Sequence, residues 1–166
     1  TTVKTGADAG GGEDTITLTK VSSTFTTLEI NGDGAAADTN LNEVSITRAT
    51  TSGTDDSATI KITNTDSDGN LINSTKGALL TGAVTLPGIE NLTITTDQLH
   101  ADTSSSTRDG GVALTLTANG TRSLTVVSET RVDLSGAALD DEIRTVDASA
   151  ANGGILLEMD DAADAD

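Results

Sequence analysis

The residues with the clearest chemical pattern are acidic and amide side chains that alternate along a glycine-containing segment. This segment reads Asn64-Thr65-Asp66-Ser67-Asp68-Gly69-Asn70-Leu71. Calcium prefers six to eight hard oxygen ligands, and carboxylates at alternate positions beside a glycine direct several oxygens toward one point. The segment follows the opening of the D-x-[DN]-x-[DN]-G calcium loop with Asn64 in place of the leading Asp, and its twelfth position is Thr75 rather than a bidentate glutamate. The pattern predicts Ca²⁺ ligands at Asn64, Asp66, Asp68 and Asn70.

A second acidic segment, Asn31-Gly32-Asp33-Gly34, is followed by Asp38 and offers fewer ligands. We expect Asp33 and Asp38 to contribute to calcium binding. For both segments the alternative is an ordinary turn, because Asp and Asn side chains bond to the local backbone and Gly supplies positive φ.

The charge of the chain supports a bound cation and excludes some partners. The 166 residues include 26 acidic and 9 basic side chains, for a net charge of −17. This balance excludes binding to nucleic acids and anionic membranes, which require Lys and Arg. No apolar run approaches the roughly 20 residues that span a bilayer, so membrane insertion is not expected. Ca²⁺ would relieve the self-repulsion, and the alternative is a salty habitat in which ions screen it.

Residues for catalysis are scarce. The chain has no Cys, a single His at His100, and no G-x-S-x-G nucleophile elbow around any serine. Phe25 is the only aromatic residue, so stacking platforms for sugars are missing. We therefore expect no enzymatic activity, and a polysaccharide-acting enzyme is the least favoured function.

Composition and alternation indicate an all-β chain. There are 31 Thr and 17 Gly against one Pro, and β-branched residues favour strands over helices. Apolar and polar residues alternate, or nearly so, in six segments: 15–19, 58–63, 83–86, 112–117, 131–134 and 154–159. Five more strands are predicted by a repeated phrase whose first, fourth and sixth positions are mostly apolar: 25–30, 41–46, 89–94, 121–126 and 143–148.

In a strand, positions four and six of this phrase face one side, and position one lies where the chain turns inward. Such a short edge cannot bury itself, so the repeats indicate a shared core between stacked strands. The phrase predicts that its apolar residues are buried together: Leu28, Ile30, Val44, Ile46, Leu92, Ile94, Leu124, Val126 and Val146.

Turn signals separate these strands at short but uneven intervals. We therefore expect one β-rich module over 1–166, folded as an irregular β-solenoid of short stacked strands with long loops at 31–40, 64–80 and 97–110. A β-sandwich is the alternative.

Two passages carry a family resemblance. Pro87-Gly88-Ile89-Glu90-Asn91-Leu92-Thr93-Ile94 and the segment from Thr145-Val146-Asp147-Ala148 to Gly153-Gly154 resemble repeat phrases of bacterial surface-layer proteins that leave the cell by type I secretion. The resemblance implies a Ca²⁺-dependent, extracellular lattice protein of the bacterial cell surface, of which this chain is a fragment. The family's glycine-aspartate calcium nonapeptide is incomplete here, its nearest form starting at Gly11.

The expected function is therefore that of a structural module in a self-assembling surface layer stabilised by Ca²⁺. Its partners would be copies of itself or neighbouring modules, joined through strand edges at Thr2-Val3 and Ile155-Leu156-Leu157, which lack protective Lys and Pro. Contact with a surface polysaccharide remains open. The alternative is a β-solenoid adhesin or ice-binding module with Thr ladders, ranked second because the Thr-x-Thr pairs start unevenly at 15, 93 and 115.

Overall fold

Every regular element that the structure describes is a β-strand. The computed structural model describes residues 2–5, 15–22, 24–31, 40–41, 43–48, 53, 55–63, 79–96, 111–135, 137–139 and 143–157. Within these ranges there is no helix that could cross a membrane. Sheet A contains β1 (Thr2–Thr5), β3 (Thr27–Asn31), β6 (Ser57–Thr63), β8 (Asn91–Thr96), β10 (Ser123–Ser128) and β13 (Thr145–Ala151), in that order.

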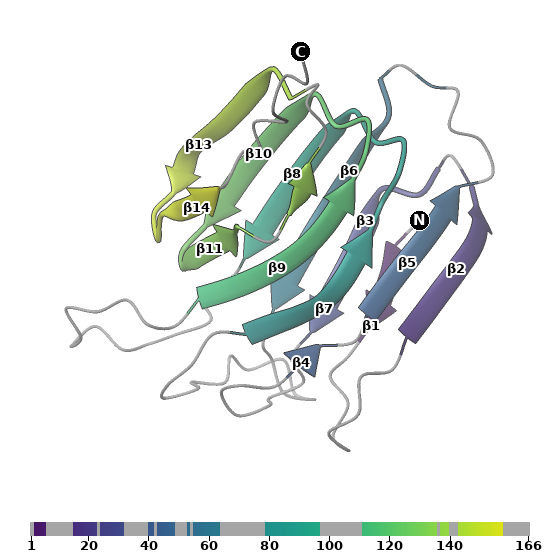
Figure 1. The fold of residues 1–166 in the computed structure, drawn as a ribbon, viewed down its shortest axis with the longest axis horizontal. Coiled ribbons are helices and arrows are strands. Elements are labelled where there is room, and N and C mark those ends of the chain that lie inside the picture. Colours follow the sequence, from purple (N-terminus) through teal and green to yellow (C-terminus); the bar gives the residue numbers. More distant parts are fainter. Residues whose placement is uncertain are drawn as a thin grey trace, which may run out of the picture.

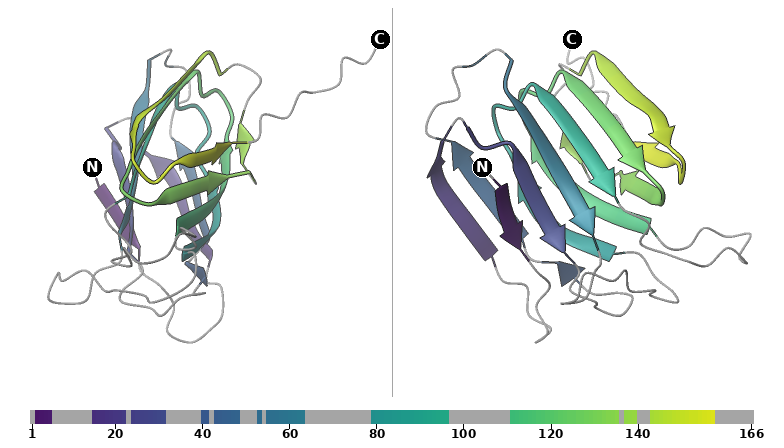
Figure 2. Two further views of the ribbon diagram at one scale, coloured as in Figure 1. Left: turned by 90° about the vertical axis from the view of Figure 1, so that its left-hand side faces the viewer. Right: turned by 180° about the vertical axis from the view of Figure 1, so that it is seen from behind.

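Sheet B faces sheet A across the core. In spatial order it contains β14 (Ile155–Leu157), β11 (Arg131–Leu134), β9 (Gly111–Ala118), β7 (Leu79–Thr85), β5 (Glu43–Arg48) and β2 (Thr15–Val21). Two short strands lie off this path, since β4 (Asn40–Leu41) pairs with β7 and β12 (Ala138–Leu139) pairs with β9. The two layers are seen from the side in Figure 2.

The connectivity makes the chain a β-solenoid. The chain passes back and forth between the two sheets from β1 to β14, with β4–β5 and β11–β12 as consecutive strands of sheet B, and every strand pairing is parallel (Figure 1). A β-sandwich joins antiparallel strands through hairpins and Greek keys, and that alternative is excluded by the parallel register. The prediction of stacked short strands is confirmed.

The coils of the solenoid differ in length. Val3, Leu28, Ile60, Ile94 and Val126 are successive register partners in sheet A, so these coils take 25, 32, 34 and 32 residues. The last coil, from Leu124 to Val146, takes only 22. Most of the predicted loop residues lie outside the described part of the chain, but Asn31 belongs to β3, Asn40 to β4 and residues 79–80 to β7.

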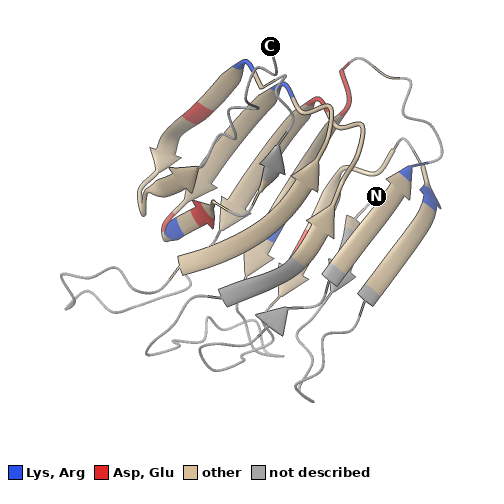
Figure 3. Ribbon diagram, in the orientation of Figure 1, with Lys and Arg blue, Asp and Glu red and all other residues tan. Residues whose placement is uncertain are grey.

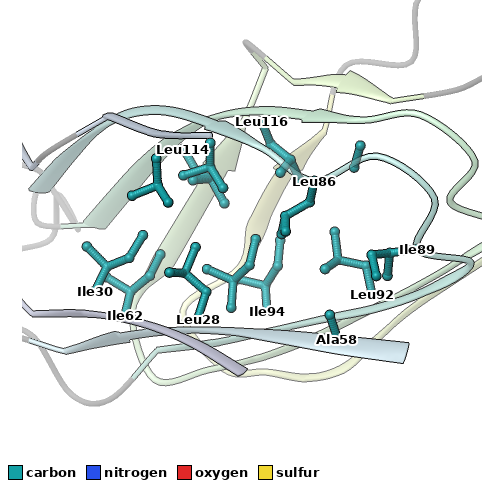
Figure 4. Close-up of a cluster of buried hydrophobic side chains, with 14 of the residues drawn as sticks. Leu28, Ile30, Ala58, Ile62, Leu86, Ile89, Leu92, Ile94, Leu114 and Leu116 are labelled. Carbon is teal, nitrogen blue, oxygen red and sulfur yellow. The ribbon is translucent and has the colours of Figure 1, made fainter. Parts of the chain in front are cut away.

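The core is a thin double layer of aliphatic side chains between the sheets (Figure 4). Strands β3, β6, β8 and β10 alternate buried and partly exposed residues along most of their length, because successive side chains of a strand point to opposite faces. Each inward residue packs on its register partners in the coils before and after it. Leu28, Ile60 and Ile94 form such a column and are fully buried.

In three of its five copies the first position of the repeated phrase closes the corner between the sheets, as predicted, whereas Leu41 belongs to β4 and Ile143 is only partly buried. Phe25, Ile89 and Thr121 are all at most 1% exposed. Thr121 is polar, and its buried hydroxyl donates a 2.9 Å hydrogen bond to the carbonyl of Ile89 in the preceding coil.

The predicted burial is confirmed for eight of the nine phrase residues and is wrong for Val146, which is 40% exposed. Val146 is the register partner of the buried Leu124, so its position in the column is the expected one. It lies on β13, however, and no described strand covers the far side of β13. A residue of this column is buried only when a coil lies on each side of it.

All eleven predicted strands are present, with shifted ends. Three strands were not predicted, namely β1, β4 and β12, which have two to four residues each. Such short segments carry too few residues for alternation to stand out.

Truncating a column residue in a central coil should destabilise the fold. We expect Ile94→Ala to lower the free energy of unfolding by about 2–4 kcal/mol, through lost burial and the cavity that remains. The matched control is Val127→Ala on β10, because Val127 is 42% exposed. Urea denaturation measures both, and equal losses in the two variants would contradict the assigned core.

Candidate functional site

The predicted calcium ligands lie outside the described residues. This holds for Asn64, Asp66, Asp68 and Asn70, for Asp33 and Asp38, and also for His100. Within the described ranges there is no group of three or more His, Cys, Asp or Glu residues arranged to hold a metal ion. The placement of the strands that flank these segments is nevertheless informative.

Four acid-rich connections start from one edge of the solenoid. Because all strands of sheet A are parallel, their carboxyl ends lie at the same edge. The ends of β3 and β6 are direct register partners at Asn31 and Thr63, and Thr96 of β8 is the partner of Ile62. The segments that follow β1, β3, β6 and β8 are 6–14, 32–39, 64–78 and 97–110, and they contain ten Asp or Glu against two Lys or Arg.

A polar cluster occupies the opposite edge, where the chain passes from sheet B to sheet A. Arg48, at the end of β5, is 6% exposed and donates from Nη1 to Asp56 Oδ2 at 2.7 Å and to the Gly88 carbonyl at 2.8 Å. Its buried Nε has no hydrogen-bond partner. Arg48 thereby ties its own coil to the corners of the next two coils.

Asp56 and Glu90 extend the cluster through hydrogen bonds that involve backbone groups. The amide of Asp56 donates to Glu90 Oε2 at 2.8 Å, and the Asp56 carbonyl accepts from the amides of Glu90 and Asn91 at 3.1 and 2.9 Å. The carbonyls of Glu90 and Arg122 each accept two amides of the following coil in the same way. Many of the described charged residues gather along this edge (Figure 3).

The hydrogen bond from Arg48, together with its positive charge, lowers the pKa of the Asp56 carboxyl, and partial burial opposes this effect. Asp56 thus stays ionised at neutral pH and keeps the buried guanidinium paired. The cluster connects structural elements, and we assign it a stabilising role.

The outer face of sheet A carries a column of threonines in register. Thr2, Thr27, Thr59, Thr93 and Thr125 are successive partners across five strands, and the sixth position of the column is Asp147. Parallel strands lie about 4.8 Å apart, so the column presents hydroxyl groups at that interval. Four of these threonines are partly exposed and Thr2 is exposed.

The columns on either side of the threonines are polar in different ways. One contains Ser57, Asn91, Ser123 and Thr145. The other runs Lys4, Glu29, Lys61, Thr95 and Val127, so opposite charges are register partners at its start. Opposite charges on directly paired strands stabilise the pairing.

The uneven Thr-x-Thr spacing of the sequence has a structural explanation. The pairs that start at Thr15 and Thr115 lie on β2 and β9 of sheet B, whereas the pair at Thr93 lies on β8 of sheet A. Within sheet A the column threonines from Thr27 to Thr125 recur every 32 or 34 residues. The starting positions 15, 93 and 115 are uneven because they belong to two different sheets.

The last coil is bound closely to the preceding coil, and no described strand covers its outer side. Asn152 donates from its amide to the Ser128 carbonyl at 2.7 Å, and a Cβ on Gly153 would overlap the backbone of Thr130. On β13, Asp147 Oδ1 accepts the amide of Ser149 at 2.9 Å, and hydrogen bonds from Ser149 lower the pKa of Asp147. Asp147 therefore marks the uncovered edge with a negative charge.

The Arg48 cluster was not identified from the sequence. The sequence feature that could have indicated it is Arg48 itself, which is the only basic residue between Lys20 and Lys61. It ends a strand and is followed by Asp55-Asp56. Glu90, which accepts the Asp56 amide, is 34 positions from Asp56, and only the coil length brings the two residues to the same edge. In comparisons with known proteins, no family model, curated protein or solved structure matches this chain.

The Arg48–Asp56 pair should make stability depend on acid pH. A carboxyl with a lowered pKa stabilises the fold above its ordinary value of 3.8, and this contribution disappears as pH falls through the folded-state pKa. We expect Asp56→Asn to lower the melting temperature at pH 7, and the difference from the unsubstituted chain to vanish in acid.

Asp55→Asn is the matched control, because it removes a neighbouring carboxylate that accepts an exposed hydrogen bond from Asn91 and does not contact Arg48 in the described part of the chain. Thermal unfolding between pH 2 and 7 measures all three proteins. A melting difference for Asp56→Asn that stays constant over this range would contradict the assigned pair.

Proposed function

We propose that the chain is a structural module of a self-assembling bacterial cell-surface layer, stabilised by Ca²⁺ and without turnover of a substrate. The observation that carries the proposal is the common edge from which the four acid-rich connections start. The strand ends from which these connections start lie at neighbouring register positions of sheet A.

The charge balance of these connections favours a cation. With ten acids and two bases they account for −8 of the net charge of −17. Like charges tethered at one edge repel each other, and hard divalent cations with oxygen ligands relieve that repulsion. The ligands that we propose are Asp33 and Asp38 in the connection after β3, and Asn64, Asp66, Asp68 and Asn70 in the connection after β6.

The architecture also fits a structural role outside the cell. A parallel solenoid is a rigid, elongated body in which each coil contacts only its neighbours, and its length can be extended by adding coils. The resemblance of the phrases around Ile89 and Val146 to surface-layer repeats agrees with this role and with export to the bacterial cell surface. A surface polysaccharide is a further contact that such a layer would make.

Calcium should raise the melting temperature of the chain. A ligand that binds only the folded state at a hundredfold excess over its Kd adds about 2.7 kcal/mol, which for this length corresponds to roughly 5–10 °C. We expect Asp66→Ala and Asp68→Ala to reduce this increase and the control Asp164→Ala to leave it unchanged. Calorimetry with Ca²⁺ and with EDTA measures the effect, and equal melting temperatures in both would refute calcium binding.

A second candidate function is supported by the threonine column of sheet A. Regularly spaced hydroxyls on a flat parallel sheet can order water or contact another hydroxyl-rich surface, as an ice-binding or adhesive module requires. The adjacent Glu29 and Lys61 oppose this reading, because charged groups interrupt the hydroxyl surface on one side. We therefore keep it second.

This candidate predicts that the chain shapes growing ice crystals. We expect Thr93→Lys, in the middle of the column, to abolish the shaping by placing a long charged side chain on the flat face. Thr115→Lys is the control, because Thr115 is an exposed strand residue of sheet B. Ice microscopy distinguishes these outcomes, and round, unshaped crystals with the unsubstituted chain would eliminate the candidate.

A further inference from the structure

Both ends of the solenoid leave part of the core uncovered. At the carboxyl-terminal end Val146 is 40% exposed, and Ile155 and Leu157 are partly exposed although they pack against the core. At the amino-terminal end Leu18 and Val21 show the same intermediate burial against the core. Column residues of the inner coils, by contrast, are fully buried.

The strands at the two ends of sheet A also have one unpaired edge each. Among the described strands, β13 pairs only with β10, and β1 pairs only with β3. In the part of the chain that the structure describes, no strand pairs with the far side of either strand. Edges of this kind are templates for strand addition unless charges, prolines or a covering segment block them.

The register of sheet A indicates which strand fits. The threonine column begins at Thr2 on β1 and ends at Asp147 on β13, passing through one residue of every strand between them. A strand that adds to β13 and continues the same column therefore places a β1-like residue beside Asp147. The strand β1 of another copy has the required direction, since all strands of the sheet are parallel.

The charges of the end strands are complementary. The residues of β1 and β2 include Lys4 and Lys20 and no acid, whereas those of β13 and β14 include Asp147 and no base. With Thr2 beside Asp147, Lys4 lies two register positions further along the added strand. The two ends attract each other, although the whole chains repel.

We infer that β13 of one copy accepts β1 of a second copy as the next parallel strand of sheet A, with Thr2 in register beside Asp147. This inference rests on the proposed self-assembly and specifies its contact. The contact is heterologous, because the two surfaces are different ends of the molecule, so association continues into rows rather than closing as a dimer. At −17 per copy the rows form only when salt or Ca²⁺ screens the repulsion.

Disulfide trapping tests the register directly, because the chain contains no cysteine. We expect Asp147→Cys mixed with Thr2→Cys to give a disulfide-linked dimer at high salt, since neighbouring strands lie about 4.8 Å apart, within the roughly 4.4–6.8 Å between Cα atoms that a disulfide spans. The control mixture is Thr93→Cys with Thr2→Cys. Thr93 belongs to the same column, but β8 already has a partner on each side.

Sedimentation velocity in rising salt provides the second measurement. Val146→Lys should weaken self-association at least about tenfold, because the contact would bury an unpaired charge. Thr115→Lys, at an exposed position of the inner strand β9 in sheet B, should leave association unchanged. Association that Val146→Lys does not weaken, equal cross-linking in both mixtures, or a chain that stays monomeric at all salt concentrations would each overturn this inference.

The inference and the proposed function fail separately. A chain that melts higher with Ca²⁺ and associates in a manner insensitive to Val146→Lys retains its function and loses this contact. Loss of the calcium response, with the cross-link still formed, would remove the calcium-stabilised layer and leave the stacking contact intact.

Discussion

The whole structure depends on parallel, in-register pairing between successive coils. A single coil has two short strands and a few aliphatic side chains, which is too little to bury a core. Pairing in register places Leu28 over Ile60 and Ile60 over Ile94, so each residue receives a neighbour on both sides. Burial, corner hydrogen bonds and the outer columns all follow from this one alignment, because a slip by one residue would exchange the two faces of a strand.

The alignment also explains how a chain with one aromatic residue folds at this length. Aromatic side chains usually supply much of the buried area in a core. Here the distance between the sheets is filled by Ile, Leu and Val repeated from coil to coil, and Phe25 is used once, at a corner. Aliphatic β-branched residues suit such a core, since they stack in columns on a pleated surface.

Much of this fold was accessible from the sequence because the alternation of β6, β8 and β10 is local information. The phrase at Leu92-Thr93-Ile94 identifies a strand and its inner face without knowledge of any partner. The sheet and coil to which a strand belongs cannot be read from its local sequence, because connections of uneven length separate one strand from the next. For this reason the phrase at residues 41–46 was grouped with copies that form sheet A, although β5 belongs to sheet B.

Functional residues were harder to predict for the same reason. The threonine column joins residues 25 to 34 positions apart, and Arg48 meets the Gly88 carbonyl 40 positions away. Local spacing does identify candidate calcium loops, since those ligands are close in sequence, and the proposed ligands Asp66 and Asp68 come from that signal. Val146 shows where local patterns mislead. Its sequence pattern is that of a core residue, but it is exposed because it lies in the last described coil.

The unequal coil lengths have a mechanical consequence. When a solenoid is pulled from its ends, the outermost coil detaches first, because it is held by pairing on one side only. Each released coil adds its full contour length of about 3.3–3.6 Å per residue, so coils of 22 to 34 residues lengthen the chain by roughly 70–120 Å each. Under tension this body would yield in discrete steps of unequal size, absorbing extension coil by coil while the remaining coils keep their shape.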